Sequence, residues 1–405
     1  MPKTFWIERE IKKSYQDLVD DVNQLQEVSG YIYQQNGYNV FVRIVHSLLN
    51  DYPIVLFDGD FSESEFSELS KGLSNFEKVK IRANQNYSLA ALGKLSENLK
   101  NWSIMLFTSG TTGLPKLISH NFASITKAVK ISEDHKKDVW AFAYNPTHMA
   151  GIQVFFQALL NHNTLVNVFK KSSDEIKHLL QEYRVTHISA TPTFYRLMLD
   201  GKTSFANVKQ ISSGGEKLND KLKAKLKLAF PGAKLRNIYA STEIGSLFAS
   251  QGEDFIIPER LGKYVKIKNN QLLVHKDIIG QSASIQFKDG WYYTGDIVEL
   301  KEETSVTKFS FSHRENEMIN VGGYKVNPNE VELEIQKIVG VKAARVYGKK
   351  NSVLGNILCA DVVSVNLKEK AIREILAKSL QNFKIPRMIN FVNEMKLTRT
   401  GKLPR

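Results

Sequence analysis

Short apolar runs alternate with amphipathic segments along the first half of this sequence. Apolar residues recur with helical spacing in five segments: Tyr15–Leu25, Asn39–Leu49, His120–Lys130, Gln153–Leu160 and Asp174–Tyr183. Between them lie runs with the length and composition of strands: Tyr52–Phe57, Trp102–Phe107, Val139–Tyr144, Thr164–Phe169 and Thr186–Ser189. This alternation predicts an α/β body whose sheets are mostly parallel.

The pattern changes after Arg260, where short β-type pieces replace the alternation. These pieces are Leu272–His275, Ser284–Phe287 and Thr307–Phe311, and helical spacing returns near Asn329–Ile338 and Lys368–Leu380. The predicted linker is the polar stretch Ser312–Glu317, which lies between the last of these β-type pieces and the first of the two helical segments. A chain of 405 residues exceeds what one core usually organises. We therefore expect a large body of several subdomains with a β-rich part, residues 1–315, and a small mobile α+β domain, residues 316–405.

Composition narrows the compartment and the class of protein. Cys359 is the only cysteine, so no disulfide can form within the chain. No apolar run has the length of a membrane span, and the first residues lack the pattern of a signal peptide. These features predict a cytoplasmic globular protein.

The formal net charge of +13 raises the question of an acidic partner. Such a charge suits a nucleic acid, an anionic membrane, a phosphate-rich ligand or an acidic protein. The lysines are spread along the chain rather than gathered in one arm, which favours a solvated surface instead. No nucleic-acid-binding motif accompanies the charge, so we expect no nucleic-acid partner.

One loop carries a clear chemical signal. Residues Thr108–Lys116 read Thr-Ser-Gly-Thr-Thr-Gly-Leu-Pro-Lys, after a predicted strand and before a predicted helix. Glycines let backbone N–H groups curl around an anion, hydroxyls donate further hydrogen bonds, and the lysine adds charge. The lysine does not directly follow the last glycine, as it does in a Walker loop. A plain surface turn is the alternative, but the density of these residue types favours a polyphosphate site.

This loop resembles the signature loop of the adenylate-forming superfamily, which includes acyl- and aryl-CoA synthetases, peptide-synthetase adenylation domains and firefly luciferase. Other motifs of the superfamily follow in the same order. Tyr239-Ala240-Ser241-Thr242-Glu243 resembles its Tyr-Gly-x-Thr-Glu motif, with alanine in place of the usual glycine. Gly214-Gly215-Glu216 resembles the glycine pair beside adenine, and Asp296 ends a segment similar to Tyr-x-Thr-Gly-Asp.

The resemblance implies an ATP site with defined roles. Residues expected to bind ATP or AMP are Thr108, Ser109, Gly110, Thr111, Thr112, Lys116, Gly214, Gly215, Glu216, Tyr239, Ala240, Ser241, Thr242, Asp296 and Arg314. A tyrosine ring can stack on adenine, a carboxylate can accept two ribose hydroxyls, and Glu243 can hold Mg²⁺.

The C-terminal motifs imply a moving domain that delivers a catalytic lysine. Lys402, in a segment similar to the superfamily's last motif, is expected to stabilise charge at the transition state. Asn316 stands at the position of the hinge residue, and Gly322-Gly323 matches the loop beside the thiol tunnel. The predicted catalytic residues are Lys402, Thr242, Glu243 and His148.

The same resemblance implies the reaction. The chain is expected to convert a small carboxylic acid and ATP into an acyl-adenylate and pyrophosphate, and then to pass the acyl group to a thiol. The thiol belongs to CoA or to phosphopantetheine on an acidic carrier protein, and both alternatives stay open. The motifs are closest to those of benzoate-type and o-succinylbenzoate-type CoA ligases. The residues expected to line the acyl pocket are Tyr144, His148, Gln153, Ser213 and Ser241.

Two further points remain open. Only 107 residues precede the signature loop, fewer than in most relatives, so part of the N-terminal subdomain is expected to be shortened. That shortening affects the acyl pocket or a dimer surface, and a homodimer is left open. A nucleotide-binding regulator without catalysis is the alternative from a different class. The joint presence of Lys116, Glu243, Asp296, Arg314 and Lys402 argues against it.

Overall fold

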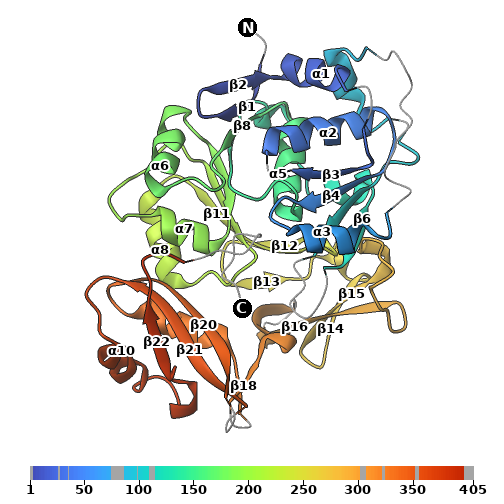
Figure 1. Cartoon of the computed structure of the whole chain (residues 1–405). Helices are drawn as coiled ribbons and strands as arrows, with labels where there is room; N and C mark the ends of the chain where they lie inside the picture. The colour runs from blue at the N-terminus through green and yellow to red at the C-terminus, as the bar shows by residue number, and fades with distance from the viewer. Residues whose placement is uncertain are drawn as a thin grey trace.

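The computed structural model of the chain describes residues 3–25, 28–34, 36–73, 86–97, 99–108, 115–301, 307–321, 324–351 and 355–395. Figure 1 shows a large body and, at its lower left in orange and red, a smaller C-terminal part. Among the described residues, no helix is long and apolar enough to cross a membrane.

The body is organised around an eight-stranded sheet. Its strands lie in the spatial order β12 (Gly245–Ser250), β11 (Lys234–Ser241), β10 (Gln210–Gly214), β9 (His187–Ala190), β7 (Val139–Phe142), β8 (Thr164–Asn167), β1 (Thr4–Glu8) and β2 (Ile11–Ser14). Neighbours from β11 to β1 are parallel, and only the outer pairs, β11–β12 and β1–β2, are antiparallel. The predicted parallel α/β body is thus confirmed.

A four-stranded sheet supports the start of the body. It contains β3 (Tyr31–Gln34), β4 (Ile54–Asp58) and β5 (Ile104–Phe107) in parallel and β6 (Leu117–His120) antiparallel to β5. Every residue of β4 is buried, as expected for a continuous apolar strand covered on both faces. On one face it contacts α3 (Glu63–Ser70) through a small aromatic cluster.

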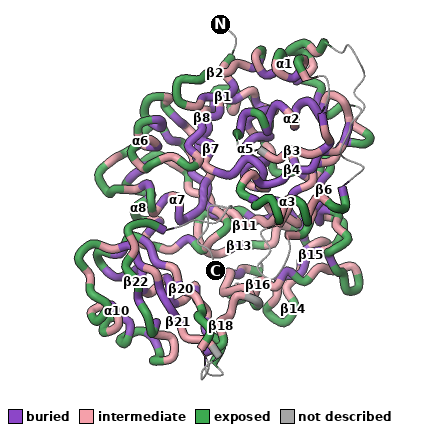
Figure 2. Tube along the Cα trace, in the orientation of Figure 1, coloured by how far each residue is buried: buried purple, intermediate pink, exposed green. Residues whose placement is uncertain are grey.

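Helices fill the space between these two sheets and cover the outer face of the larger one. Residues of α1 (Tyr15–Asn23), α2 (Gly37–Leu49) and α5 (Met149–Leu160) share one apolar core with both sheets. On the other face of the eight-stranded sheet, α6 (Ser173–Glu182), α7 (Pro192–Met198) and α8 (Asp220–Ala229) form a second core. Figure 2 shows α2, α5 and β4 as largely buried.

A five-stranded antiparallel sheet completes the body. Its order is β13 (Asp254–Ile256), β17 (Lys308–Arg314), β16 (Trp291–Lys301), β15 (Gln271–His275) and β14 (Val265–Lys268). The prediction of β-rich structure after Arg260 is therefore correct, except that Ser284–Phe287 forms no strand. The predicted linker Ser312–Glu317 begins as the last three residues of β17 and continues as a 3-10 turn, Glu315–Glu317.

The C-terminal part has its own apolar core, which runs from Val321 to Ile389. Its elements are β18 (Ile319–Val321), β19 (Tyr324–Val326), α9 (Pro328–Lys337), β20 (Val341–Asn351), β21 (Gly355–Ser364), α10 (Glu369–Leu376) and β22 (Met388–Phe391). It contacts the body through α9, because Lys221 of α8 donates hydrogen bonds to the carbonyl oxygens of Gln336 and Ile338. The division at residue 315 remains a prediction.

Candidate active site

The described residues enclose a cleft of about 2120 Å³ between the two large sheets and α9. Most of the predicted site residues that the structure describes line this cleft. They are Thr108, Lys116, Tyr144, His148, Gln153, Gly214, Gly215, Glu216, Tyr239, Ala240, Ser241, Thr242, Glu243, Asp296 and Arg314. Ser213 is not among them. Ser109, Gly110, Thr111, Thr112, Gly322, Gly323 and Lys402 lie outside the described residues, as does the side chain of Asn316.

The alternation of side chains along β10 explains the position of Ser213. Side chains alternate between the two faces of a strand, so Ser212 and Gly214 face the cleft while Ser213 points to the other side. Ser213 is fully buried, and its hydroxyl has no hydrogen-bond partner among the described residues. The expectation that it lines the acyl pocket has no support in this geometry.

The stem of the predicted phosphate loop is a hairpin. Thr108 donates its backbone N–H to the carbonyl of Lys116 (2.8 Å), and Lys116 donates its own N–H to Thr108 Oγ1 (3.0 Å). The stem joins the antiparallel strands β5 and β6, which pair Phe107 with Leu117. The sequence predicted a helix over His120–Lys130 directly after the loop. The structure instead has β6 first and then the short helix α4 (Phe122–Thr126).

A hydrogen-bonded group from three strands forms the side of the cleft where the nucleotide is predicted to bind. The Tyr239 hydroxyl donates to Asp296 Oδ2 (2.6 Å), and Arg314 Nε lies 3.3 Å from Asp296 Oδ1. The register of β16 and β17 places Asp296 directly opposite Arg314. Burial raises the pKa of the Asp296 carboxyl above its ordinary value, although the charge of Arg314 and the hydrogen bond from Tyr239 act against it.

The ring of Tyr239 is packed as well as hydrogen-bonded. It stacks on Phe311 with ring centroids 4.3 Å apart and an interplanar angle of 14°. Burial raises the pKa of the Tyr239 hydroxyl well above its ordinary value, and so does the neighbouring Asp296. One face of the ring is therefore covered by protein, and the predicted contact with adenine is left to the rest of the ring.

The glycine pair after β10 is a tight turn next to β11. Gly215 has a φ of +83°, a left-handed conformation that favours glycine, and a Cβ on Gly214 would lie 3.0 Å from the Ile238 carbonyl oxygen. Glu216 follows and anchors the turn to the start of α7. Its Oε2 accepts from the Thr193 hydroxyl (2.7 Å) and backbone N–H (3.2 Å).

The Thr242–Glu243 turn is fixed from behind by two groups that sequence reasoning missed. His120 Nε2 lies 2.8 Å from the Thr242 carbonyl oxygen, and the Gly280 N–H donates to the Glu243 carbonyl oxygen (2.7 Å). These bonds leave the Glu243 side chain on the cleft wall. A carboxylate there suits a hard cation such as Mg²⁺, which prefers oxygen ligands.

On the side of the cleft where the acyl group is predicted to bind, His148 is paired with a buried carboxylate. His148 Nε2 lies 2.7 Å from Asp58 Oδ2, and Asn145 Nδ2 donates to Asp58 Oδ1 (3.1 Å). Asp58 belongs to none of the motifs and was not predicted, although a polar residue at the carboxyl end of a buried parallel strand is a recognisable signal of a site. Burial raises the pKa of the neighbouring Tyr144 hydroxyl to about 12.

Several polar atoms on the cleft walls lack a partner within the described part of the chain. They are Gln153 Nε2, Ser241 Oγ and Glu216 Oε1. Buried polar groups are normally hydrogen-bonded, so atoms of this kind indicate groups that a bound molecule can satisfy. A nucleotide and a carboxylic acid together carry suitable donors and acceptors, so the residues present fit both.

Comparison with known proteins agrees with this geometry. A family model described as AMP-binding enzyme matches residues 58–273, more than half of the chain. A second model, AMP-binding enzyme C-terminal domain, matches residues 330–402. The 2-succinylbenzoate–CoA ligase of Staphylococcus aureus strain JH9 is 26% identical over 336 residues, which cover 76% of this chain and 67% of the relative. The enzyme of strain MSSA476 has the same identity and coverage.

Solved structures share the fold. The o-succinylbenzoate CoA synthetase of Bacillus subtilis, in complex with an acyl-adenylate, aligns with a TM-score of 0.73 and 19% identity over 100% of this chain and 94% of that one. ATP-bound MatB from Rhodopseudomonas palustris aligns with a TM-score of 0.71 and 16% identity over 99% and 94%. The predicted fold class and the predicted resemblance are confirmed, and the chain belongs to the family of AMP-binding enzymes.

Proposed function

We propose that this chain is an acid–CoA ligase whose acid is aromatic and of the 2-succinylbenzoate kind. The family match and the relatives named as CoA ligases confirm the broader prediction of an AMP-forming acid–thiol ligase that works through an acyl-adenylate. The observation that supports the proposal is the shared cleft. Tyr239, Asp296 and Arg314 line this cleft on its proposed nucleotide side, and His148, held by Asp58 behind it, lines the same cleft on its proposed acyl side.

The proposed reaction has two steps. In the first, a carboxylate oxygen of the acid bonds to the α-phosphorus of ATP while the bond from that phosphorus to pyrophosphate breaks. In the second, the CoA sulfur attacks the acyl carbon, AMP leaves, and the thiol proton passes to solvent. The first step depends mainly on positioning and on stabilising charge. Lys116, Thr242 and Lys402 are the proposed groups for that charge, with Mg²⁺ held at Glu243.

The walls of the acyl side support a polar acid rather than a long fatty acid. Alternate residues of β9 and β10 face the cleft, and most of them are polar. They are His187, Ser189, Gln210 and Ser212, and Arg236 of the neighbouring β11 also lines the cleft. A long alkyl chain offers no hydrogen bonds to such a surface, and each buried polar group that it left without a partner would cost about 1–3 kcal/mol. An aromatic acid with a second polar substituent would satisfy some of them.

The C-terminal part is proposed to act as a lid that turns about Asn316. The face of α9 that meets the cleft contributes Asn329, Glu332 and Gln336 to its lining. Gln336 Oε1 accepts from Asn219 Nδ2 at 3.3 Å. Lys221 also donates across this contact, to the carbonyl oxygens of Gln336 and Ile338, and a polar contact of this kind suits a domain that must move between the two steps. Gly322 and Gly323 are the proposed backbone beside the thiol tunnel.

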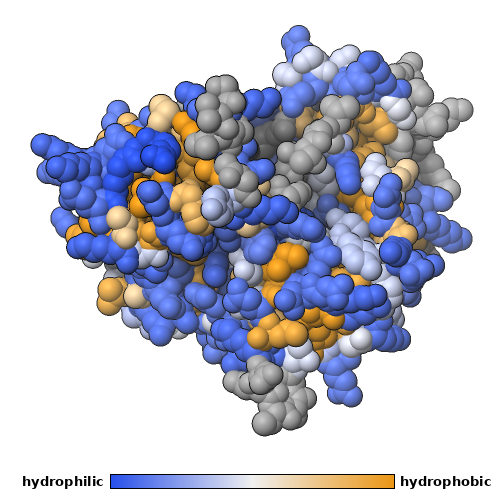
Figure 3. All heavy atoms as spheres, turned by 90° about the horizontal axis from the view of Figure 1, so that it is seen from below, coloured by the Kyte–Doolittle hydropathy of each residue, from blue (hydrophilic) through white to orange (hydrophobic). Residues whose placement is uncertain are grey.

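A carrier protein is the alternative thiol donor, and the charge of the chain supports it. Figure 3 shows hydrophilic side chains over most of the lower face of the molecule, with small hydrophobic patches between them. Together with the net charge of +13, this surface suits an acidic partner. A homodimer and a cytoplasmic location also remain proposals, the second resting on the single, buried Cys359.

The test is a substrate panel with two readouts. Pyrophosphate release is measured with 2-succinylbenzoate, benzoate, palmitate and an amino acid, and the thioester product is identified by mass spectrometry with CoA or holo-carrier protein. We expect the highest release with 2-succinylbenzoate and a CoA thioester as the product. Release that is greatest with palmitate would overturn the proposed substrate. A thioester formed only on carrier protein would overturn CoA as the proposed acceptor.

Two lysine variants, one of them a control, test the role of Lys402. Lys402→Ala should slow adenylate formation by about 10²–10³-fold, the usual effect of removing a group that stabilises transition-state charge. Lys370→Ala is the matched control, because the Lys370 side chain is 89% exposed on α10. Pyrophosphate release that is absent with every acid and unchanged in both variants would favour a regulator without catalysis.

A further inference from the structure

A second group of ligand-type side chains lies away from Glu243, at the other end of the parallel strands. His135 ends the 3-10 turn η3 (Glu133–His135), Asp138 directly precedes β7, and His187 begins β9. The strands β7 and β9 are parallel neighbours, and their register pairs Trp140 with His187. The group is therefore at the amino ends of strands whose carboxyl ends lead toward the proposed nucleotide site.

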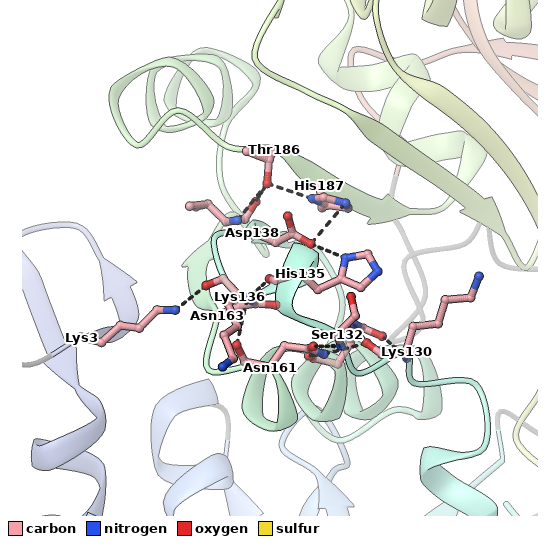
Figure 4. Close-up of polar contacts among 12 residues, drawn as sticks. Lys3, Lys130, Ser132, His135, Lys136, Asp138, Asn161, Asn163, Thr186 and His187 are labelled. Atoms are coloured by element: carbon pink, nitrogen blue, oxygen red, sulfur yellow. Dashed lines mark hydrogen bonds and ion pairs between the residues drawn. The ribbon is translucent and has the colours of Figure 1, made fainter. Parts of the chain in front are cut away.

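The geometry brings one atom of each side chain to a common point. Asp138 Oδ2 lies 2.8 Å from His135 Nδ1 and 3.6 Å from His187 Nε2, and all three ligand atoms lie within 4.8 Å of one another. Figure 4 shows the Asp138 carboxylate with the His135 and His187 rings directed toward it. Atoms bound to one tetrahedral zinc ion at about 2.0–2.2 Å are separated by about 3.3–3.5 Å.

The surroundings hold two of the three ligands in position. Thr186 Oγ1 lies 2.8 Å from His187 Nδ1, and it also accepts from the Val139 N–H (2.9 Å) and donates to the Val139 carbonyl (3.1 Å). With the Thr186 proton given to Val139, His187 donates from Nδ1 and presents the lone pair of Nε2 to Asp138. Fixing the outer nitrogen in this way is the usual arrangement around a metal-binding histidine.

His135 is fixed through its backbone. Asn163 Nδ2 donates to the His135 carbonyl oxygen (2.6 Å), and Asp138 donates its N–H to the same oxygen (3.1 Å). Asp138 and His187 are buried, whereas the His135 side chain is 32% exposed. Both histidines line the cleft, so an ion and its water ligands have a path of entry.

We propose that His135, Asp138 and His187 bind a divalent cation of the Zn²⁺ class. Two imidazole nitrogens and one carboxylate oxygen are a donor set that favours first-row transition metals over Mg²⁺, which prefers oxygen alone. The cation takes the place of the hydrogen bond between His135 and Asp138, and their 2.8 Å contact lengthens to the spacing of two ligands. It ties the turn before β7 to the start of β9, and its open position faces the cleft.

The experiment is a titration of the untagged, chelator-treated chain with Co²⁺, a coloured substitute for Zn²⁺. We expect one equivalent to bind, with visible absorption bands of a nitrogen- and oxygen-ligated site that excess Mg²⁺ does not remove. Zn²⁺ should displace the Co²⁺ and raise the melting temperature, because a ligand that binds only the folded state stabilises it.

Variants identify the ligands. His135→Gln and Asp138→Asn should each weaken Co²⁺ binding by at least about tenfold, the scale of losing one ligand or its close support. His178→Ala is the control, since the His178 side chain is 74% exposed and, among the described residues, pairs with Glu182 on the surface of α6. His135→Gln alters a partly exposed residue, and its fold is checked by circular dichroism. Absence of a stoichiometric site, or binding that His135→Gln and His178→Ala change equally, would overturn the proposal.

Discussion

His148 and Asp58 form a hydrogen-bonded pair across 90 residues of sequence, with His148 Nε2 2.7 Å from Asp58 Oδ2. Asp58 ends β4 and is 4% exposed, and it also accepts from Asn145 Nδ2 (3.1 Å) and the Asp60 N–H (2.9 Å). Because an ionised carboxylate can only accept, the Nε2 atom of His148 carries the proton. The ring is thereby held with its other nitrogen available to the cleft.

The first prediction concerns the carboxylate of this pair. Burial acts to raise the pKa of Asp58, but the hydrogen bond and charge of His148 and the Asp60 N–H outweigh it, so the pKa lies below its ordinary value. Asp58→Asn should lower the free energy of unfolding by about 1–3 kcal/mol at pH 7. Because the pKa of Asp58 is lower in the folded state, its carboxylate stabilises the fold at pH values above the unfolded-state pKa, about 3.9. This stabilisation is lost as the pH falls through the folded-state pKa.

Urea unfolding of the wild type and the variant at pH 7 and at decreasing pH measures this difference. The gap should be constant near neutrality and should narrow below about pH 4. Asp277→Asn is the matched control, because Asp277 forms an exposed pair with His275 Nδ1 (3.2 Å). Exposed pairs contribute little, so this variant should stay near the wild type. A gap that is the same at every pH would contradict the explanation.

The second prediction concerns the Tyr239–Asp296 bond on the proposed nucleotide side of the cleft. Tyr239→Phe removes the hydroxyl that donates to Asp296 Oδ2 at 2.6 Å but keeps the ring on Phe311. Hydrogen bonds to charged groups contribute about 1.5–3 kcal/mol, so we expect the KM for ATP to rise by about ten- to a hundredfold. The KM for the acid should change little.

Steady-state pyrophosphate release with ATP and the acid varied in turn measures this prediction. Tyr264→Phe serves as the control, since Tyr264 packs against the core of the five-stranded sheet but is not one of the described residues that line the cleft. Equal changes in both Michaelis constants for Tyr239→Phe would show that the bond supports the whole cleft rather than the nucleotide side.

Much of the fold was predictable because its signals are local. The buried strand β4 and the amphipathic helix α6 are each defined by a few consecutive residues. The error at Ser284–Phe287 has the same origin. That segment has the composition of a strand, but in the described part of the chain no strand pairs with it. Its flanks form only isolated bridges, between Gln281 and Ser119 and between Lys288 and Trp291.

In the candidate site, only residues that belong to a recognisable motif were predictable from the sequence. Tyr239, Asp296 and Arg314 each belong to a recognisable segment, and the structure brings them together. Asp58 and His120 belong to no such segment, because their roles arise from contacts with His148 and Thr242 that are set by sheet packing. For the same reason, motif matching did not reveal which residues of β10 face the cleft.

The third prediction uses the buried ammonium of Lys127. It donates to the Ile244 carbonyl oxygen, and burial, together with the charge of Arg260, lowers its pKa to about 8. Between about pH 8 and about pH 10.4, the usual pKa of lysine, Lys127 is then mostly protonated in the unfolded chain and mostly neutral in the folded one. Stability contributed by this site therefore rises with pH across that window.

Lys127→Met should remove this rise, which we expect to be about 1–2 kcal/mol. Thermal and urea unfolding at several values between pH 7.5 and 10 measure it. Lys370→Met on the surface of α10 is the control and should keep the wild-type slope, because its side chain is 89% exposed. A slope that persists in Lys127→Met would assign the effect to other groups.

The last prediction concerns the close contact behind Glu243. Gly280 donates its N–H to the Glu243 carbonyl oxygen, and a Cβ on Gly280 would lie 2.6 Å from both His120 Cε1 and Ile118 Cγ2. Gly280→Ala should therefore push His120 away from Thr242 and shift the turn that carries Glu243. Overpacking of this kind costs about 1–3 kcal/mol of stability.

The displaced turn should also raise the Mg²⁺ concentration needed for half-maximal pyrophosphate release, if Glu243 holds the ion as proposed. Gly252→Ala is the matched control, because a Cβ there would meet nothing within 4 Å. Urea unfolding and Mg²⁺ titrations on both variants separate the two effects. Lower stability with an unchanged Mg²⁺ requirement would mean that Gly280 supports the fold but does not position the Glu243 carboxylate.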